Sequence, residues 1–290
     1  MTAPAREWPG ATESGLICAV AGSSQRQMRE WLEAYPGLFS AKPFDDALTS
    51  TLSLAMAFSG PWFTAERLSV ANKATLWAFG LDWQVDYVAA SAPEVDDIAR
   101  RCLAAADGAD PAPGDDLARF LADLRRDLSA APAFPALGHV WREELRVMLA
   151  AMRLEREWRD AGTVPSLEQY LGNADNLGFT FVFVSHLIHT GAPSGAIAAV
   201  REAAAAVQRV IRLLNDLGTY RRDVEWGDLN ALLLGAPREE VDRRLAALAA
   251  RARELIEPLR DGDPLIAGYL ERQMDFCAGF YRLADYWGDL

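Results

Sequence analysis

The chain has 290 residues, of which 51% are hydrophobic and 24% are charged. A chain of this length and composition can bury a large core, which excludes disorder as its main state. Its 41 acidic and 29 basic side chains give a net charge of −12. Neither a nucleic acid nor an anionic membrane is therefore an expected partner, and an anionic ligand would need a cation to mediate its binding.

Three cysteines are spread along the chain, at Cys18, Cys102 and Cys277. Their odd number and wide spacing match neither a disulfide framework nor a zinc site. The N-terminal sequence has no basic segment followed by an apolar one, and no stretch approaches the length of an apolar membrane span. We therefore expect a cytoplasmic protein that does not cross a membrane.

Ten segments with helical periodicity follow one another along the chain, and Pro and Gly residues separate them. Alternating β-branched residues, which would indicate strands, are scarce. The predicted helices span residues 24–34, 43–58, 64–89, 94–106, 115–129, 136–161, 166–190, 195–224, 238–258 and 263–286. Because no long linker divides the chain, we expect an all-α fold with one domain over residues 1–290, in which residues 1–22 are loosely ordered.

The predicted helix 166–190 contains the stretch 178–188, which is apolar on every side. Such a helix belongs at the centre of a domain rather than on its surface. Gly178 is a candidate for a break in this helix. His186 and His189 lie in the same stretch without a neighbouring nucleophile, and we expect them to be structural or cavity-lining residues.

Two acids lie on the inward face of the predicted helix 64–89. On a helical wheel Asp86 falls about 40° from Asp82, and Phe79 lies within about 60° of the same direction. Lys73 and Gln84 fall almost opposite. Because unpaired buried carboxylates are costly, this arrangement requires basic partners or a divalent metal ion.

A second polar face lies on the predicted helix 195–224. Asn215, Thr219, Asp223 and the two arginines Arg212 and Arg222 fall within about 100° of one another, and apolar residues occupy the opposite side. An all-oxygen triad at i, i+4 and i+8 suits a hard cation such as Mg²⁺. Guanidinium groups beside it suit the oxygens of a phosphate or diphosphate.

Each face has an ordinary explanation when it is taken alone. An Asp pair at i, i+4 is common on solvated helix faces, and a polar stripe opposite an apolar one is normal for a surface helix. The second stripe is less ordinary, because Asn, Thr and Asp form helices less readily than Glu and Lys. Together the two stripes indicate a site for divalent cations and a diphosphate between two helices.

The two motifs resemble those of a class I terpene synthase, in the expected order along the chain. The segment from Asn215 through Thr219 to Asp223 is similar to the family's Asn-x-x-x-Ser/Thr-x-x-x-Glu motif, with Asp in place of Glu. The pair Asp82 and Asp86 corresponds to the family's Asp-Asp-x-x-Asp/Glu motif with one acid missing. The resemblance implies one all-α bundle around an apolar cavity, with three Mg²⁺ ions and a diphosphate at its mouth.

The resemblance also implies a role for each candidate residue. It assigns the metal ions to Asp82, Asp86, Asn215, Thr219 and Asp223, and the diphosphate to Arg212 and Arg222. Cations and arginines would stabilise the departing diphosphate as the allylic C–O bond ionises, and a dry, aromatic cavity would hold the carbocation. Phe79, Gly178 and Tyr281 are the candidates for the substrate cavity.

Many bacterial members of the family carry an arginine roughly 46 residues before the asparagine of the second motif. The corresponding segment here, residues 170–178, has none. In this respect the chain is similar to the kaurene-synthase-like branch. That branch implies a C20 prenyl or labdane-type, copalyl-like diphosphate as substrate. A separate class II cyclase would supply the bicyclic form, because this chain lacks an Asp-x-Asp-Asp motif.

Three alternatives remain open at this stage. A sesquiterpene synthase would use farnesyl diphosphate in the same site. A chain-elongating prenyl diphosphate synthase would share the fold but would be expected to carry two Asp-rich motifs. A non-catalytic helical interaction protein would explain the amphipathic helices but not the clustered triad and arginines. The oligomeric state is also open, with a homodimer as one option.

Overall fold

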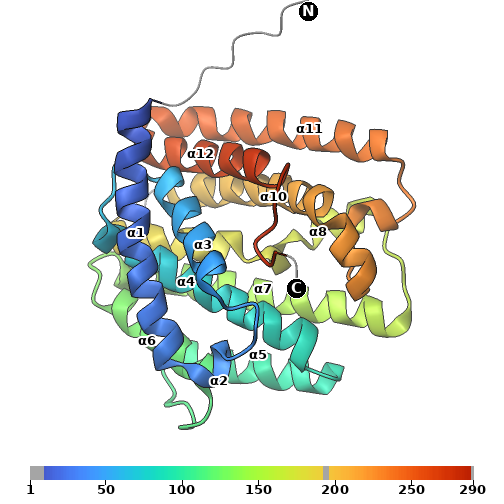
Figure 1. Ribbon diagram of the computed structural model, residues 1–290, viewed down its shortest axis with the longest axis horizontal. Coiled ribbons are helices and arrows are strands. Elements are labelled where there is room, and N and C mark those ends of the chain that lie inside the picture. The colour runs from blue at the N-terminus through green and yellow to red at the C-terminus, as the bar shows by residue number, and fades with distance from the viewer. Residues whose placement is uncertain (1–9, 192–195, 289–290) are drawn as a thin grey trace, which may run out of the picture.

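The computed structural model describes residues 10–191 and 196–288, and its regular elements over these residues are all helical (Figure 1). The first half of the chain forms α1 (Ala11–Ala34), α2 (Pro36–Phe39), α3 (Asp46–Ser59), α4 (Ala65–Trp83), α5 (Ala92–Ala106) and α6 (Asp116–Ser129). The second half forms α7 (Phe134–Ala161), α8 (Leu167–Gly172), α9 (Phe179–Thr190), α10 (Ile197–Trp226), α11 (Arg238–Ile256) and α12 (Pro264–Phe280). Shorter turns are the π turn Gln84–Val88 and the 3₁₀ turns Ala174–Leu177, Ala231–Leu233 and Glu257–Asp261. The all-α prediction is confirmed.

Local signals in the sequence set many of the helix ends. The side chains of Asp45 and Thr64 accept hydrogen bonds from the first turns of α3 and α4. Ser166 and Gln169 form a reciprocal capping box at the start of α8. α7 ends at Ala161 and is capped by Gly162, whose φ of +61° favours glycine. These caps satisfy backbone groups that a helix end would otherwise leave unpaired.

The expectation that residues 1–22 are loosely ordered is wrong for residues 11–22, which form the first half of α1. The physical reason is burial. Ile17 and Ala21 are each 3% exposed and pack in one cluster with Ala57 of α3 and Leu68 of α4. Residues 1–9 lie outside the described part of the chain.

α9 is the central helix of the bundle, as its composition predicts. Its residues from Phe179 to Ile188 are all buried. It packs against both α4 and α10, and also against α7. These contacts place the two helices that carry the polar motifs on different sides of one apolar core. None of the helices in the described residues is long and apolar enough to span a membrane.

The predicted helix 166–190 is divided into α8, a 3₁₀ turn and α9, and the break falls at Gly178. Gly178 has a φ of +71°, and a Cβ at this position would lie 2.7 Å from Sδ of Met148. Both the backbone conformation and the close approach therefore require glycine. Because the chain turns here, Asn176 and Phe179 reach the central cavity from either side of the break.

The last predicted helix, 263–286, ends earlier than expected, at Phe280. The segment that follows, residues 281–288, runs from α12 into the middle of the bundle (Figure 1). Tyr286 and Trp287 pack there against Phe79 of α4, with ring centroids 5.5 and 5.1 Å away. Burial of these two rings explains why the chain leaves the helical path.

Candidate functional site

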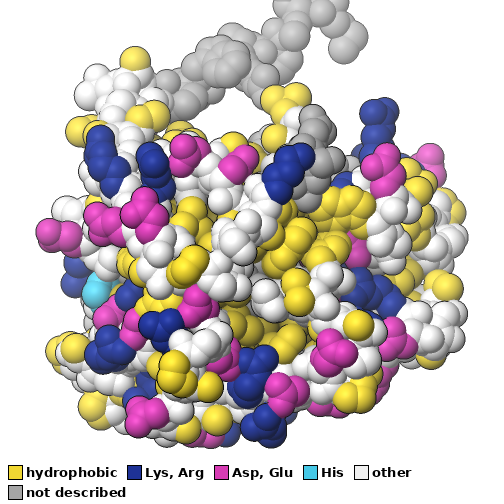
Figure 2. Space-filling view, turned by 60° about the horizontal axis from the view of Figure 1, so that its bottom comes forward, with side chains coloured by type: hydrophobic (Ala, Val, Ile, Leu, Met, Phe, Trp, Pro, Cys, Tyr) yellow, Lys and Arg dark blue, Asp and Glu magenta, His cyan; other side chains and the backbone are white. Residues whose placement is uncertain are grey.

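A cavity of about 190 Å³ opens between α4, α7, α10 and the segment 281–288. Its apolar wall includes Leu52, Met56, Phe79, Met148, Phe179 and Trp287. The face of the molecule in Figure 2 exposes hydrophobic side chains in its middle, with basic and acidic side chains around them. Ionisable groups also line the cavity: the carboxylates of Asp82, Asp86, Glu155, Asp223 and Asp228, and the guanidinium groups of Arg159, Arg212 and Arg222.

Most of the site residues predicted from the sequence lie around this cavity. Those that line it are Phe79, Asp82, Asp86, Arg212, Asn215, Arg222, Asp223 and Tyr281. Thr219 is buried directly behind Asp223, and its hydroxyl donates to Asp223 Oδ2 at 2.6 Å. Gly178 does not line the cavity, but its neighbours Leu177 and Phe179 do.

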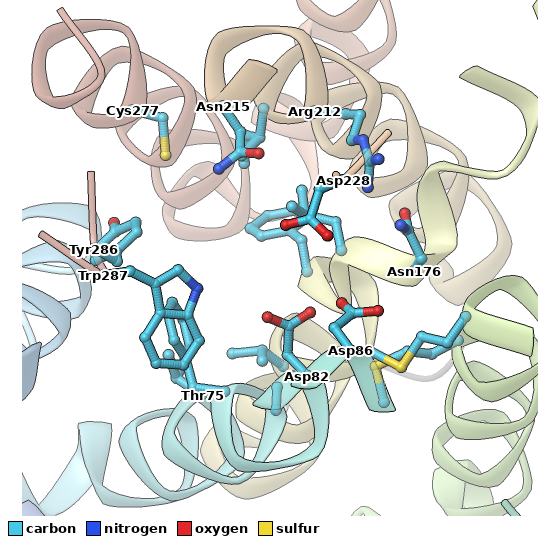
Figure 3. Close-up of a pocket in the computed structure, with 18 of the residues that line it drawn as sticks. Thr75, Asp82, Asp86, Asn176, Arg212, Asn215, Asp228, Cys277, Tyr286 and Trp287 are labelled. Atoms are coloured by element: carbon cyan, nitrogen blue, oxygen red, sulfur yellow. The ribbon is translucent and has the colours of Figure 1, made fainter. Parts of the chain in front are cut away.

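Asp82 and Asp86 project into the cavity from the end of α4 and the π turn that continues it (Figure 3). The π turn is closed by a hydrogen bond from the amide of Ala89 to the carbonyl of Gln84 at 2.8 Å. A π turn has more residues per turn than an α-helix, so the α-helical wheel gives only the approximate direction of Asp86. The predicted inward orientation of both acids is nevertheless confirmed.

The two carboxyl groups are electrostatically unfavourable when no cation is bound. Burial, with a further contribution from the neighbouring carboxylate of Asp228, raises the pKa of Asp82 to about 7. Burial and the proximity of Asp82 also raise the pKa of Asp86 well above its usual range. The local positive charge is therefore too small to keep both groups readily ionised.

α10 forms the opposite wall, from which Asn215 projects into the cavity (Figure 3). Asp223 of the same helix also lines the cavity. Nδ2 of Asn215 donates to the hydroxyl of Tyr281 at 3.1 Å, which links the helix to the C-terminal segment. Asp223 is 3% exposed and accepts hydrogen bonds from Thr219 and Asn230. These contacts fix the orientation of the carboxylate from behind.

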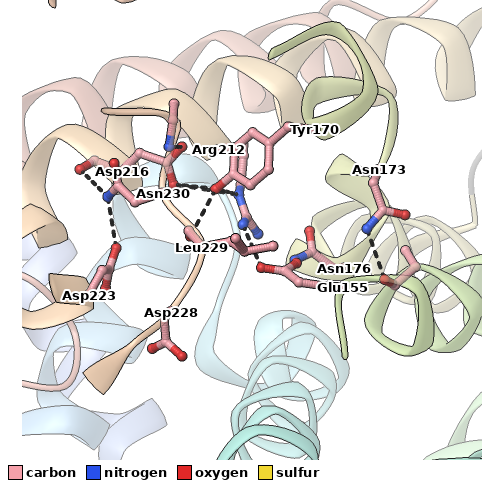
Figure 4. A network of polar contacts seen from close by, with 12 residues as sticks. Glu155, Tyr170, Asn173, Asn176, Arg212, Asp216, Asp223, Asp228, Leu229 and Asn230 are labelled. Atoms are coloured by element: carbon pink, nitrogen blue, oxygen red, sulfur yellow. Dashed lines mark hydrogen bonds and ion pairs between the residues drawn. The ribbon is translucent and has the colours of Figure 1, made fainter. Parts of the chain in front are cut away.

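Asn230 is a positioning residue that the sequence analysis missed. Its fully buried side chain donates to Asp223 Oδ2 at 2.8 Å and to the carbonyl of Asp216 at 2.7 Å (Figure 4). Its own oxygen accepts from the amide of Leu232 at 2.9 Å. Asp216 in turn accepts from Tyr170 and from the amide of Ala231. This network ties the loop after α10 to the helix and to its motif.

Arg212 and Arg222 stand beside the motif, each with acidic partners. Arg212 donates to the Tyr170 hydroxyl at 2.7 Å and to Glu155 at 3.0 Å (Figure 4). Arg222 forms ion pairs with Asp223 at 3.0 Å and with Asp285 of the C-terminal segment at 3.1 Å. The predicted arginines therefore lie at the cavity, where they neutralise carboxylates.

Further polar residues of the site came from segments that the sequence analysis did not select. Glu155 and Arg159 lie on α7, and Asp228 follows the left-handed Gly227 that ends α10. Arg159 donates to both Asp86 and Asp228, and the hydroxyl of Tyr87 donates to Asp228 at 2.8 Å. The signal on α7 was weak because this helix has many other charged residues that face solvent.

The histidines take no part in the cavity. His186 is buried and stacks against Tyr269, with ring centroids 5.0 Å apart, and neither residue lines the cavity. Burial lowers the pKa of His186 to about 3, so its imidazole is neutral at physiological pH. The sequence-based expectation of a structural role for this residue agrees with its position.

The donor set of the site suits a hard cation. Within residues 10–191 and 196–288, no group of three His, Cys, Asp or Glu side chains forms a ready-made metal site. The oxygen donors are instead divided between two walls, and five cavity carboxylates face three arginines. Divided oxygen ligands and excess negative charge fit a divalent cation that keeps water or an anion as its other ligands.

Comparisons with known proteins agree with this geometry. A family model described as "Terpene synthase family 2, C-terminal metal binding" matches residues 73–254. A curated relative, the ent-pimara-9(11),15-diene synthase of Streptomyces sp. (strain KO-3988), is 28% identical over 277 residues, which cover 90% of each chain.

Solved structures with the same fold include 2-methylisoborneol synthase from Streptomyces coelicolor A3(2), in complex with Mg²⁺ and 2-fluoroneryl diphosphate. Its TM-score is 0.77 at 16% identity, and 94% of each chain is covered. Linalool/nerolidol synthase from Streptomyces clavuligerus, in complex with 2-fluorogeranyl diphosphate, has a TM-score of 0.72 at 16% identity. The match covers 90% of this chain and 97% of that one.

Proposed function

Since the chain belongs to terpene synthase family 2 and is a bacterial class I terpene cyclase, we propose that it ionises the diphosphate of a C20 prenyl or labdane-type substrate and cyclises the resulting carbocation. The observation that carries the proposal is the division of oxygen donors and arginines between two walls at an apolar cavity. A family of non-catalytic helical proteins would have no need for this arrangement.

We assign the cations of the site to Mg²⁺, with three ions as the family resemblance implies. Asp82 and Asp86 would ligate on one wall, and Asn215, Thr219 and Asp223 on the other. When bound, Mg²⁺ neutralises charge on the diphosphate oxygens and so weakens the allylic C–O bond. The presence of Mg²⁺ in the 2-methylisoborneol synthase structure supports this choice of metal.

The side chains around the cations would prepare the diphosphate for departure. Arg212 and Arg222 are within the cavity wall and offer bidentate hydrogen bonds to its oxygens. Asn230 and Thr219 hold the carboxylate of Asp223 from behind, so that it need not reorganise when a cation binds. Such preorganised charge stabilises the developing anion.

The apolar part of the cavity would hold the hydrocarbon chain and exclude water. Phe79, Phe179 and Trp287 line it, and aromatic faces stabilise positive charge through their quadrupoles. Trp287 reaches the cavity only because the C-terminal segment turns inward. We therefore assign this segment to the wall that shields the carbocation from solvent.

Support for a C20 substrate comes from the curated relative, whose name describes a pimarane-type diterpene. The two solved structures hold analogues of C10 diphosphates, so their ligands do not support a C20 chain length. Farnesyl diphosphate, the alternative from the sequence analysis, is the competing substrate. If the substrate is bicyclic, a separate class II cyclase must provide it. A cytoplasmic location and a homodimer complete the proposal.

The proposal is tested by incubating the purified protein with Mg²⁺ and, separately, with geranylgeranyl, copalyl and farnesyl diphosphate, followed by gas chromatography–mass spectrometry. We expect a cyclic product from a C20 substrate, with little or none from Asp86→Ala or Asn215→Ala. The control Asp242→Ala removes an exposed acid of α11 and should retain activity. A product from farnesyl diphosphate alone would refute the C20 assignment, and no product or diphosphate release in any tube would contradict catalysis.

A further inference from the structure

Arg159 connects the two sides of the cavity mouth. It lies near the C-terminal end of α7, where its Nη2 donates to Asp86 Oδ1 at 3.0 Å and its Nη1 donates to Asp228 Oδ1 at 2.8 Å. Asp86 belongs to the π turn after α4, and Asp228 to the loop after α10. Figure 3 shows these two carboxylates on facing sides of the pocket.

A cation at the proposed metal site would change the partners of Arg159. Asp86 is one of the proposed ligands, and its carboxyl group now pairs with the guanidinium. A divalent cation that ligates Asp86 would supply this positive charge instead. The Nη2 donors of Arg159 that now face Asp86 would then be available to an anion that binds together with the cation, while Nη1 keeps its contact with Asp228.

Arg222 has a parallel position on the other wall. It pairs with Asp223, a proposed metal ligand of α10, just as Arg159 pairs with Asp86. Arg212 differs, because it is held by Glu155 and stacks over the Tyr170 ring at 4.4 Å. Each proposed metal-binding wall therefore has one arginine whose partner is also a proposed metal ligand.

The segment at the break before α9 provides no such group, because residues 170–178 contain no arginine. The side of the cavity formed by α7 and the π turn depends on Arg159 for positive charge. Arg153 and Arg156, the other arginines near this end of α7, do not line the cavity. Arg159 is thus the residue that could meet a diphosphate from this side.

We propose that Arg159 is a third diphosphate-binding arginine, which pairs with Asp86 while the site is empty and donates to the diphosphate instead when cations take over that carboxylate. This inference rests on the proposed function. It predicts that Arg159 favours binding of the anion and opposes binding of the cation alone. A purely structural ion pair would also compete with the cation for Asp86, but it would not favour binding of the anion.

The test compares Arg159→Gln with the control Arg153→Gln, which removes the same group from a pair with Asp96 on the outside of α7. Thermal melting of the full chain is followed against Mg²⁺ alone and then against inorganic diphosphate at fixed Mg²⁺. For Arg159→Gln we expect diphosphate to bind at least tenfold more weakly, or about 1.4 kcal/mol, while Mg²⁺ alone protects at a lower concentration. The control should match the wild type in both titrations.

Equal diphosphate affinity in Arg159→Gln and the wild type would overturn the inference, and so would weaker protection by Mg²⁺ alone. If Arg159→Gln does not fold, Arg159→Lys keeps the charge but loses the planar fork. It should weaken diphosphate binding in the same direction, and an unchanged affinity would again overturn the inference. If the wild type fails to bind diphosphate with Mg²⁺ and forms no product, the proposed function itself is wrong.

Discussion

Two buried asparagines, Asn230 and Asn72, allow the contribution of the hydrogen bonds behind Asp223 to stability to be measured by comparison. Both are fully buried. The Asn230 side chain makes three hydrogen bonds, to Asp223, to the carbonyl of Asp216 and from the amide of Leu232. The side-chain atoms of Asn72 have no hydrogen-bond partner among the described residues. Replacing either residue by alanine removes the same volume, so the difference reports the hydrogen bonds.

At about 1 kcal/mol for each bond, Asn230→Ala should lower the free energy of unfolding by about 3 kcal/mol more than Asn72→Ala does. Asn72→Ala should cost little, because it also removes an amide that is unsatisfied in the interior. Urea unfolding at neutral pH, followed by circular dichroism, gives both values. Equal losses of stability in the two variants would refute the argument that these hydrogen bonds hold the loop after α10.

The remaining predictions concern two glycines and one acid. Gly178→Ala should lower the free energy of unfolding by about 2 kcal/mol, because φ is +71° and the new Cβ would approach Met148. An unchanged midpoint of the urea unfolding transition would contradict this. Gly218→Ala would place a Cβ 2.8 Å from the carbonyl oxygen of Tyr281. We expect this to displace the C-terminal segment and to lower kcat in steady-state kinetics. A normal kcat would contradict the role of this segment in shielding the carbocation. The pKa of Asp82 is raised from its ordinary 3.8 to about 7. The folded chain therefore binds more protons than the unfolded chain between these values, and this acid destabilises the metal-free protein increasingly as pH rises through that range. In EDTA, the gain in Tm of Asp82→Asn over the wild type should be larger at pH 8 than at pH 5, and a gain independent of pH would exclude this explanation.

The sequence predicted the elements whose signals are local. Helical periodicity, caps and breakers located most of the helices, and the two polar stripes correctly indicated that Asp82, Asp86, Asn215 and Asp223 face one cavity. Each of these signals depends on residues that are close together in the sequence, so a single sequence is enough to detect them. Extension of one domain over residues 1–290 stays a prediction.

Features that depend on distant contacts could not be predicted in this way. The early start of α1 depends on burial against α3 and α4, and the inward turn of residues 281–288 depends on the rings of α4. Arg159 and Asn230 acquire their roles only because α7 and the loop after α10 meet the motif helices. In the sequence, Arg159 resembles a charged residue on a helix surface, and Asn230 resembles a residue of a turn.

The most direct test of the central claim is a crystal structure with Mn²⁺, as an anomalous scatterer in place of Mg²⁺, and inorganic diphosphate. The account predicts Mn²⁺ peaks at the carboxylates of Asp82 and Asp86 and at the triad Asn215, Thr219 and Asp223, with the diphosphate between the two walls. Arg212 and Arg222 should then donate to diphosphate oxygens. Mn²⁺ bound away from both motifs, or diphosphate bound without contact to either wall, would contradict the claim that these helices form a diphosphate-ionising site.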